Sequence, residues 1–383
     1  MHRRSSLSFY HLSNVIHRCF FPSFSSLASS GSTQTLNPNS FVSNYLKQTC
    51  GLLDEQALSA STRLPRLTST ERPDSVLRIL RHYEFSDTHI RECIRLFPQI
   101  LVANDAKTLK PALEFLQGFG LSGSELGLMV SKNPKLLTVG LSEKLVPCIE
   151  VLRSLLANDN KAIVQVLKAC KWITYKDPRI RLLPNITFLK SCGIVGSQLT
   201  MLLKRQPVLF AMSKSKLDEL VNKVLKMGVP VSSRMFVYAL YTLSCISPET
   251  LQQKFELLQS YGYSDEDLRY VFQVAPSVLR TSEKKLVSAL DFFTKVVGIE
   301  HSHLVKCPSY LMHGLEKRTI PRYKVFQILR SKMLLKKEPS FRYVLMMTEA
   351  DFLRYILKFK NYEEELLSAY NGEMNSHSSS RPL

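Results

Sequence analysis

Basic side chains recur at two fixed positions along this chain of 383 residues, and the chemistry they could perform is phosphate binding. The second-helix row lies two residues before a recurring proline or its substitute, and contains Lys132, Lys168, Arg205 and Lys306. The first-helix row lies at the start of the helical segment that follows, and contains Lys144, Arg181, Lys216, Lys285 and Arg318. Residues of equal phase in a repeat protein share a face, so each row predicts a line of positive charge.

The two rows differ in their structural explanation. Cations at the end of a helix complement its macrodipole by about 0.3 to 1 kcal/mol each, which accounts for the second-helix row. The same dipole repels cations in a first helical turn. The first-helix row therefore predicts an external anion, and a nucleic-acid backbone supplies one.

A dense basic cluster lies near the end of the chain. Between Lys317 and Lys337 there is no acidic residue, and Tyr323 and Phe326 are interleaved as candidate stacking faces or, alternatively, as core aromatics. Together with the first-helix row, this cluster gives the candidate nucleic-acid-binding residues: Lys144, Arg181, Lys216, Lys285, Lys317, Arg318, Arg322, Lys324 and Arg330.

A spacing near 35 residues positions these side chains. Prolines followed by aliphatic residues stand at 98, 134, 207, 276 and 308, and Cys170 and Thr242 hold the same frame. A glycine precedes the turn position by 14 residues at Gly120, Gly193, Gly228 and Gly262. Apolar residues at helical spacing lie on both sides of each glycine, and proline ends the second helix. Each unit is therefore predicted to be helix, glycine turn, helix and a short proline turn.

This pattern resembles the mitochondrial transcription termination factor (mTERF) family. The segment Ile320-Pro-Arg-Tyr-Lys-Val-Phe-Gln-Ile-Leu-Arg and the later Phe352-Leu-Arg-Tyr are similar to its land-plant branch. The resemblance implies an all-α, curved solenoid of about seven to eight helix–helix–3₁₀ repeats between residues 76 and 370. It also implies an organellar regulator of gene expression that binds nucleic acid along a concave groove.

The N-terminal residues differ in composition from the repeats. Residues 1–53 contain four basic residues and no acidic one, and they are rich in serine. This composition is typical of an organellar transit peptide, and its arginines favour the mitochondrion over the chloroplast. We expect residues 1–53 to be a disordered presequence, residues 54–75 a linker and residues 371–383 a disordered tail.

The formal net charge of +19 carries the functional prediction, because a large positive field favours nucleic acid as the partner. We expect a monomer that binds double-stranded DNA or structured RNA in transcription termination or regulation. The alternatives are a factor for group II intron splicing or RNA processing, and a helical scaffold for other proteins. No phosphate-binding loop, His-Glu-x-x-His or Gly-x-Ser-x-Gly motif is present, so we expect no enzyme, cofactor or metal. The apolar runs are too short to cross a membrane.

Overall fold

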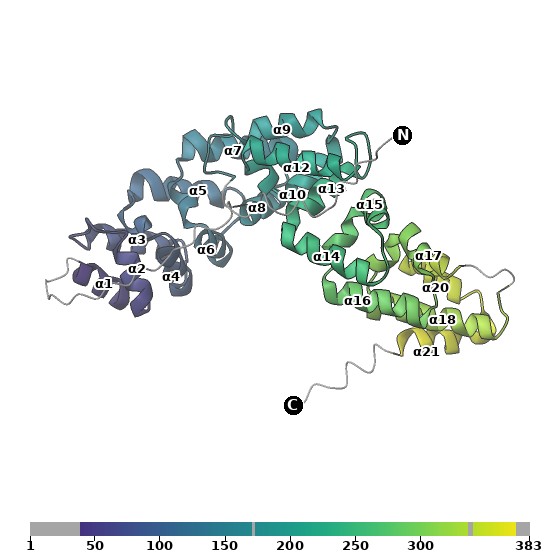
Figure 1. Cartoon of the computed structure of the whole chain (residues 1–383). Coiled ribbons are helices and arrows are strands. Elements are labelled where there is room, and N and C mark those ends of the chain that lie inside the picture. Colours follow the sequence, from purple (N-terminus) through teal and green to yellow (C-terminus); the bar gives the residue numbers. More distant parts are fainter. Residues whose placement is uncertain (1–38, 171–172, 336–339, 373–383) are drawn as a thin grey trace, which may run out of the picture. The chain divides into compact units, whose positions relative to one another are not determined.

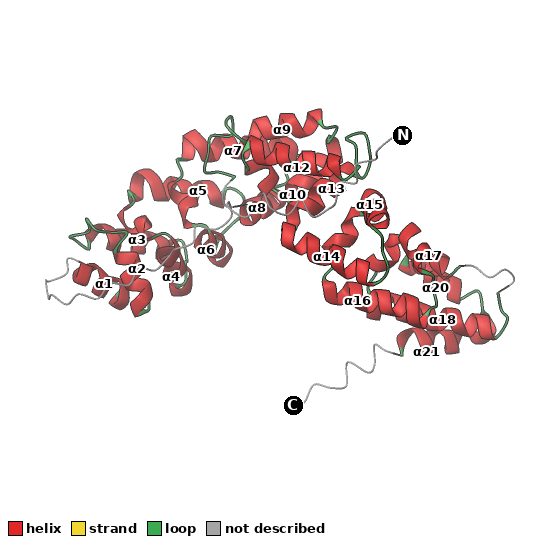
Figure 2. Ribbon diagram, viewed as in Figure 1, coloured by secondary structure: helices red, strands yellow, loops and turns green. Residues whose placement is uncertain are grey.

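The computed structural model describes residues 39–170, 173–335 and 340–372, and every regular element within them is a helix (Figure 2). The residues of this part of the chain form two compact units, 39–223 and 224–372. The boundary lies inside helix α12 (Lys214–Lys226). The predicted all-α repeat architecture is confirmed.

In the first unit, consecutive repeats follow one another along the chain (Figure 1). Each begins with a first helix, continues with a second helix and ends in a short turn element. The elements are, in order, α1 (Asn39–Gln48), α2 (Asp54–Ser61), α3 (Glu71–His82), α4 (Asp87–Leu96), η2 (Pro98–Val102), η3 (Asp105–Leu109), α5 (Lys110–Gln117), α6 (Gly123–Lys132), η4 (Pro134–Thr138), η5 (Leu141–Leu145), α7 (Val146–Leu155), α8 (Asn160–Ala169), α9 (Leu182–Ser191), α10 (Gly196–Arg205) and α11 (Val208–Ala211).

The second unit contains the remaining repeats and a C-terminal helix pair. Its elements after α12 are α13 (Phe236–Cys245), α14 (Pro248–Ser260), α15 (Asp265–Val274), η6 (Pro276–Arg280), α16 (Glu283–Asp291), η7 (Phe292–Val296), α17 (His301–Lys306), η8 (Pro308–Met312), η9 (Leu315–Thr319), α18 (Ile320–Ser331), α19 (Phe341–Met346), α20 (Glu349–Ile356), η10 (Lys360–Tyr362) and α21 (Glu363–Asn371). Helix α18 packs against both α19 and α21.

The recurring glycines turn the chain between the two helices of a repeat. Gly120, Gly193 and Gly262 have φ values of 81°, 79° and 92°, in the left-handed region that glycine adopts without strain. In the repeat that ends at Pro98, the same phase is occupied by Glu84, which has a φ of 61°. The turn between the two helices therefore requires a left-handed residue even in a repeat that has no glycine there.

The proline turns form as predicted at Pro98, Pro134, Pro276 and Pro308, each of which opens a 3₁₀ helix. The repeat at Thr242 differs. Residues 231–235 form only turns, and α13 runs through the turn position with Thr242 buried inside it. Because α13 packs on η6 as a turn element would, the frame is kept although the separate second helix is lost.

The expected linker at residues 54–75 is not what the structure shows. Helix α2 begins at Asp54, pairs with α1 and contacts α4. Gly51, with a φ of 68°, stands 14 residues before Pro65. Leu67 N donates to Leu64 O at 3.1 Å, as Ile100 N donates to Phe97 O around Pro98. Residues 39–67 are thus one further repeat in frame. The expected disorder of residues 1–38 and 373–383 lies outside the described residues.

Candidate nucleic-acid interface

The second-helix row is exposed at each of its members. Lys132, Lys168 and Arg205 lie in the last turns of α6, α8 and α10 of the first unit, and Lys306 lies in the last turn of α17 of the second. Within residues 39–170, 173–335 and 340–372, none of the four has a carboxylate within ion-pair distance; the nearby pair Lys204–Asp159, at 3.3 Å, uses a neighbouring lysine. An external anion can therefore bind these cations without breaking an ion pair inside the protein.

Two members of the first-helix row donate hydrogen bonds to groups inside the protein. Arg181 donates from Nη1 to Ala211 O at 3.1 Å. Arg318 donates to Leu345 O at 3.0 Å and to Met347 O at 2.6 Å, and burial together with the charge of Arg322 lowers the pKa of its guanidinium. Both side chains are half-buried. At these two positions, backbone carbonyl groups further along the chain take the place of the external anion that the row predicts.

Arg322 cannot contact nucleic acid, so its assignment as a binding residue is wrong. Its side chain is 0% exposed. Nη1 donates to Val344 O, Leu345 O and Met347 O at 3.1, 3.1 and 2.7 Å, and Nη2 donates to a carboxylate oxygen of Glu349 at 2.9 Å. The guanidinium also lies 4.5 Å from the ring centroid of Phe352. The arginine satisfies carbonyls at the end of α19, where a helix leaves its last acceptors unpaired.

The remaining candidates are spread over both units. Lys285 and Lys317 are exposed. Lys144 is half-exposed in a groove that also contains Glu143, Glu150 and Asp177, and Lys216, Lys324 and Arg330 each have a partner inside the protein. The structure therefore does not bring the nine candidates together as one free surface.

Other side chains of the C-terminal basic cluster also contact residues of the protein itself. Lys332 pairs with Glu365 at 3.0 Å and lies over the ring of Tyr362. The Tyr323 ring packs edge-on against Phe292 and Phe341, and Phe326 is 9% exposed. Phe326 therefore belongs to the core, and the half-buried Tyr323 ring is engaged by two aromatic neighbours inside the protein. Lys336 and Lys337 lie outside the described residues.

Comparison with known proteins identifies the architecture. The family model described as mTERF matches residues 77–304 and 142–353, more than half of the chain. The chain belongs to the mTERF family. Two plant relatives from Arabidopsis thaliana are similar to it. The chloroplastic transcription termination factor MTERF8 is 24% identical over 229 residues, which cover 59% of this chain and 45% of that protein. The mitochondrial transcription termination factor MTERF15 is 19% identical over 256 residues, covering 67% and 48%. The chain spans about half the length of these curated relatives.

In this mTERF chain, sequence reasoning missed a set of internal donors four residues after the first-helix position. Asn185 donates through Nδ2 to Leu209 O, Phe210 O and Met212 O at 3.2, 3.1 and 2.9 Å. Cys148 reaches Ile173 O, and the buried Lys254 donates to Thr281 O, with its pKa lowered by burial. Arg322 occupies the same phase. We call Cys148, Asn185, Lys254 and Arg322 the inter-repeat donors. Polar side chains among apolar neighbours on a buried helix face were the available signal.

Two further observations bound the chemistry of the mTERF repeats. Within the described ranges, no group of three or more His, Cys, Asp or Glu side chains is placed to hold a metal ion. In the same part of the chain, no helix has the length and apolarity needed to cross a membrane.

Proposed function

We propose that this protein binds organellar nucleic acid, double-stranded DNA or structured RNA, and thereby regulates gene expression in mitochondria. The observation that carries the proposal is the second-helix row. Three consecutive repeats of the first unit each present an exposed cation at the same helix end, without an acidic partner in the described chain. Stacked repeats place such residues on one face, where they can neutralise successive phosphates. The family membership and the excess of basic residues support the same partner.

The structure changes which residues we assign to binding. The first-helix row was the better candidate from sequence because its members oppose the helix dipole. Since Arg181 and Arg318 instead bind carbonyls, we assign the principal phosphate contacts to Lys132, Lys168 and Arg205. Lys144, Lys285 and Lys317 remain as a second set for comparison.

The test replaces Lys132, Lys168 and Arg205 together by Gln in the full chain. Each lost phosphate contact should reduce the slope of log K against log salt by roughly 0.7 to 0.9, because fewer counterions are released. Affinity for unrelated sequences should fall in parallel. Binding is measured by fluorescence anisotropy with duplex DNA and structured RNA across a salt series.

The matched control replaces Lys144, Lys285 and Lys317 by Gln and so removes the same charge. It should reduce the slope by less than the roughly 0.7 to 0.9 that one lost phosphate contact would remove. An equal or larger loss in the control would reassign the interface to the first helices. If neither variant affected binding and a protein partner bound both, the scaffold alternative would replace this proposal.

Localisation is part of the proposal. One relative is named for the chloroplast and another for the mitochondrion, which supports an organelle without choosing between them. We propose the mitochondrion because of the arginines before residue 39. A fluorescent reporter carrying residues 1–53 should accumulate in mitochondria, and accumulation in plastids alone would contradict the choice.

A further inference from the structure

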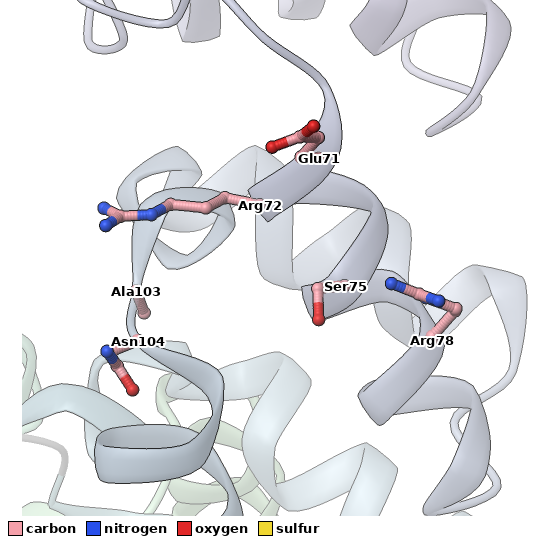
Figure 3. Close-up of a pocket in the computed structure, with 6 residues that line it drawn as sticks. All are labelled: Glu71, Arg72, Ser75, Arg78, Ala103 and Asn104. Carbon is pink, nitrogen blue, oxygen red and sulfur yellow. The ribbon is translucent and has the colours of Figure 1, made fainter.

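A pocket of about 280 Å³ opens between helix α3 and the segment Ala103–Asn104, which joins η2 to η3 in the next repeat. Arg72, Ser75 and Arg78 line it from α3, and Asn104 lines it from the opposite wall (Figure 3). Figure 3 shows Arg72 extended from the helix toward that wall. All of these residues belong to the first unit.

The pocket is rich in hydrogen-bond donors that the protein does not use. Arg72 and Arg78 are exposed, and no carboxylate of the described residues pairs with either, whereas nearby Arg81 pairs with Asp87. Asn104 accepts from Lys107 N through Oδ1 at 2.8 Å, which leaves the amide nitrogen of its side chain to donate elsewhere. One carboxylate, that of Glu71, also lines the pocket.

We propose that this pocket binds a phosphate group. The guanidinium of Arg72 lies on the side of Asn104 and gives, with the amide of that residue, donors for the acceptor oxygens of phosphate, while Arg78 lies on the opposite side and adds a second positive charge (Figure 3). Guanidinium favours such an anion over a neutral ligand. A cavity of this size admits a phosphate with its adjoining sugar. That the phosphate comes from a nucleic acid, either a strand end or the internal backbone, rests on the proposed function.

In the first measurement, inorganic phosphate is titrated into the full chain. Its binding is monitored by calorimetry or by nuclear magnetic resonance of the arginine side chains. Replacing Arg72 and Arg78 by Gln should weaken phosphate binding by about tenfold or more, since a charge-assisted bond to Arg72 and the positive charge of Arg78 are both lost. Glu71→Gln should strengthen it severalfold, because a like charge is removed from the pocket. The matched control, Arg66→Gln with Lys161→Gln, removes two exposed charges elsewhere in the same unit.

The second measurement compares one oligonucleotide with a 5′-phosphate and with a 5′-hydroxyl. A strand-end phosphate predicts that the unaltered protein distinguishes the two and that R72Q/R78Q does not. An internal phosphate predicts an equal loss of affinity for both in R72Q/R78Q.

The pocket assignment is overturned if R72Q/R78Q binds inorganic phosphate as tightly as the unaltered protein, or if the control loses as much. Phosphate binding without any oligonucleotide binding would overturn the proposed function and leave the pocket standing. Loss of phosphate binding in R72Q/R78Q with unchanged oligonucleotide affinity would overturn the nucleic acid as the source of the phosphate.

Discussion

Arg322 illustrates how a charged side chain can be part of a repeat-protein core. Removing a guanidinium from water is costly unless hydrogen bonds and a counter-charge replace the lost hydration. Here three carbonyls, the carboxylate of Glu349 and the ring of Phe352 supply most of that replacement, and only Nε of the guanidinium lacks a hydrogen-bond partner among the described residues. Glu349 in turn accepts from Tyr370 Oη at 2.6 Å, which connects α18, α20 and α21. The residue therefore holds the C-terminal helices on the last repeat.

The first prediction at this scale concerns Arg322→Gln. The shorter amide cannot serve three carbonyls, and burying unpaired acceptors is expected to lower the free energy of unfolding by about 3 kcal/mol. Urea denaturation of the full chain, monitored by circular dichroism, measures the change. Lys317→Gln, at an exposed position of the preceding turn, should change stability by less than about 0.5 kcal/mol. Equal effects would show that Arg322 is not a structural residue.

The second prediction concerns pH. Burial works to raise the pKa of Glu349, but the hydrogen bonds from Tyr370 and Arg322 outweigh it, so the pKa is lowered. A carboxyl with a depressed folded-state pKa contributes stability above its unfolded value of about 4.3, and that contribution is lost as pH falls through the folded pKa. The difference in urea midpoint between the unaltered protein and Glu349→Gln should therefore narrow below about pH 4. A constant difference from neutral pH down to about pH 3 would contradict this linkage.

At the scale of elements, the turn between the two helices of a repeat makes its own prediction. Glu84 holds a left-handed conformation that costs a side chain roughly 1 kcal/mol relative to glycine. Glu84→Gly should raise the free energy of unfolding by about that amount. Gly262→Ala should lower it similarly: no atom lies within 4 Å of the added methyl group, so the φ of 92° alone opposes it. Thermal unfolding measures both, and effects of the same sign would refute the argument.

How far sequence predicted these elements depends on whether the signal is local. The proline turns and the glycine turns are local, and they were found. The same signals at Gly51 and Pro65 were present, but the acid-free composition before Asp54 favoured a presequence. The loss of a separate second helix before Thr242 has no comparable local signal. The partners of Arg318 and Arg322 lie 22 to 29 residues further along the chain, so only the packed fold reveals them.

At the scale of the whole molecule, the N-terminal repeat changes the residue at which the proposed presequence is expected to end. Val42 and Leu46 are buried, and Tyr45 Oη donates to Asp74 at 2.7 Å. We infer that the proposed presequence ends before residue 39 rather than at residue 53. A chain starting at residue 54 should be less stable than one starting at residue 39 by at least about 3 kcal/mol, since each buried aliphatic side chain contributes about 1.5 to 3 kcal/mol. Equal thermal midpoints would restore the later boundary.

The division into two compact units follows from the same nearest-neighbour logic. In a repeat protein each unit contacts only those beside it, so a repeat without a complete second helix leaves fewer contacts across its position. The boundary inside α12 directly precedes the turns at residues 231–235 that replace this helix. The unbroken period alone predicted one elongated repeat domain, because the spacing at Thr242 is kept although its local structure is not.

The inter-repeat donors limit how this chain can be recombined. A thiol, an amide, an ammonium and a guanidinium occupy one phase, and each differs in length and in the number of hydrogens it can give. Each donor is therefore fitted to the turn that follows it and to no other. If two repeats were exchanged with the period conserved, a guanidinium would lie against a turn whose carbonyls are spaced for a thiol. A genetic duplication or shuffling event in such a gene succeeds only if the donor and the following turn move together.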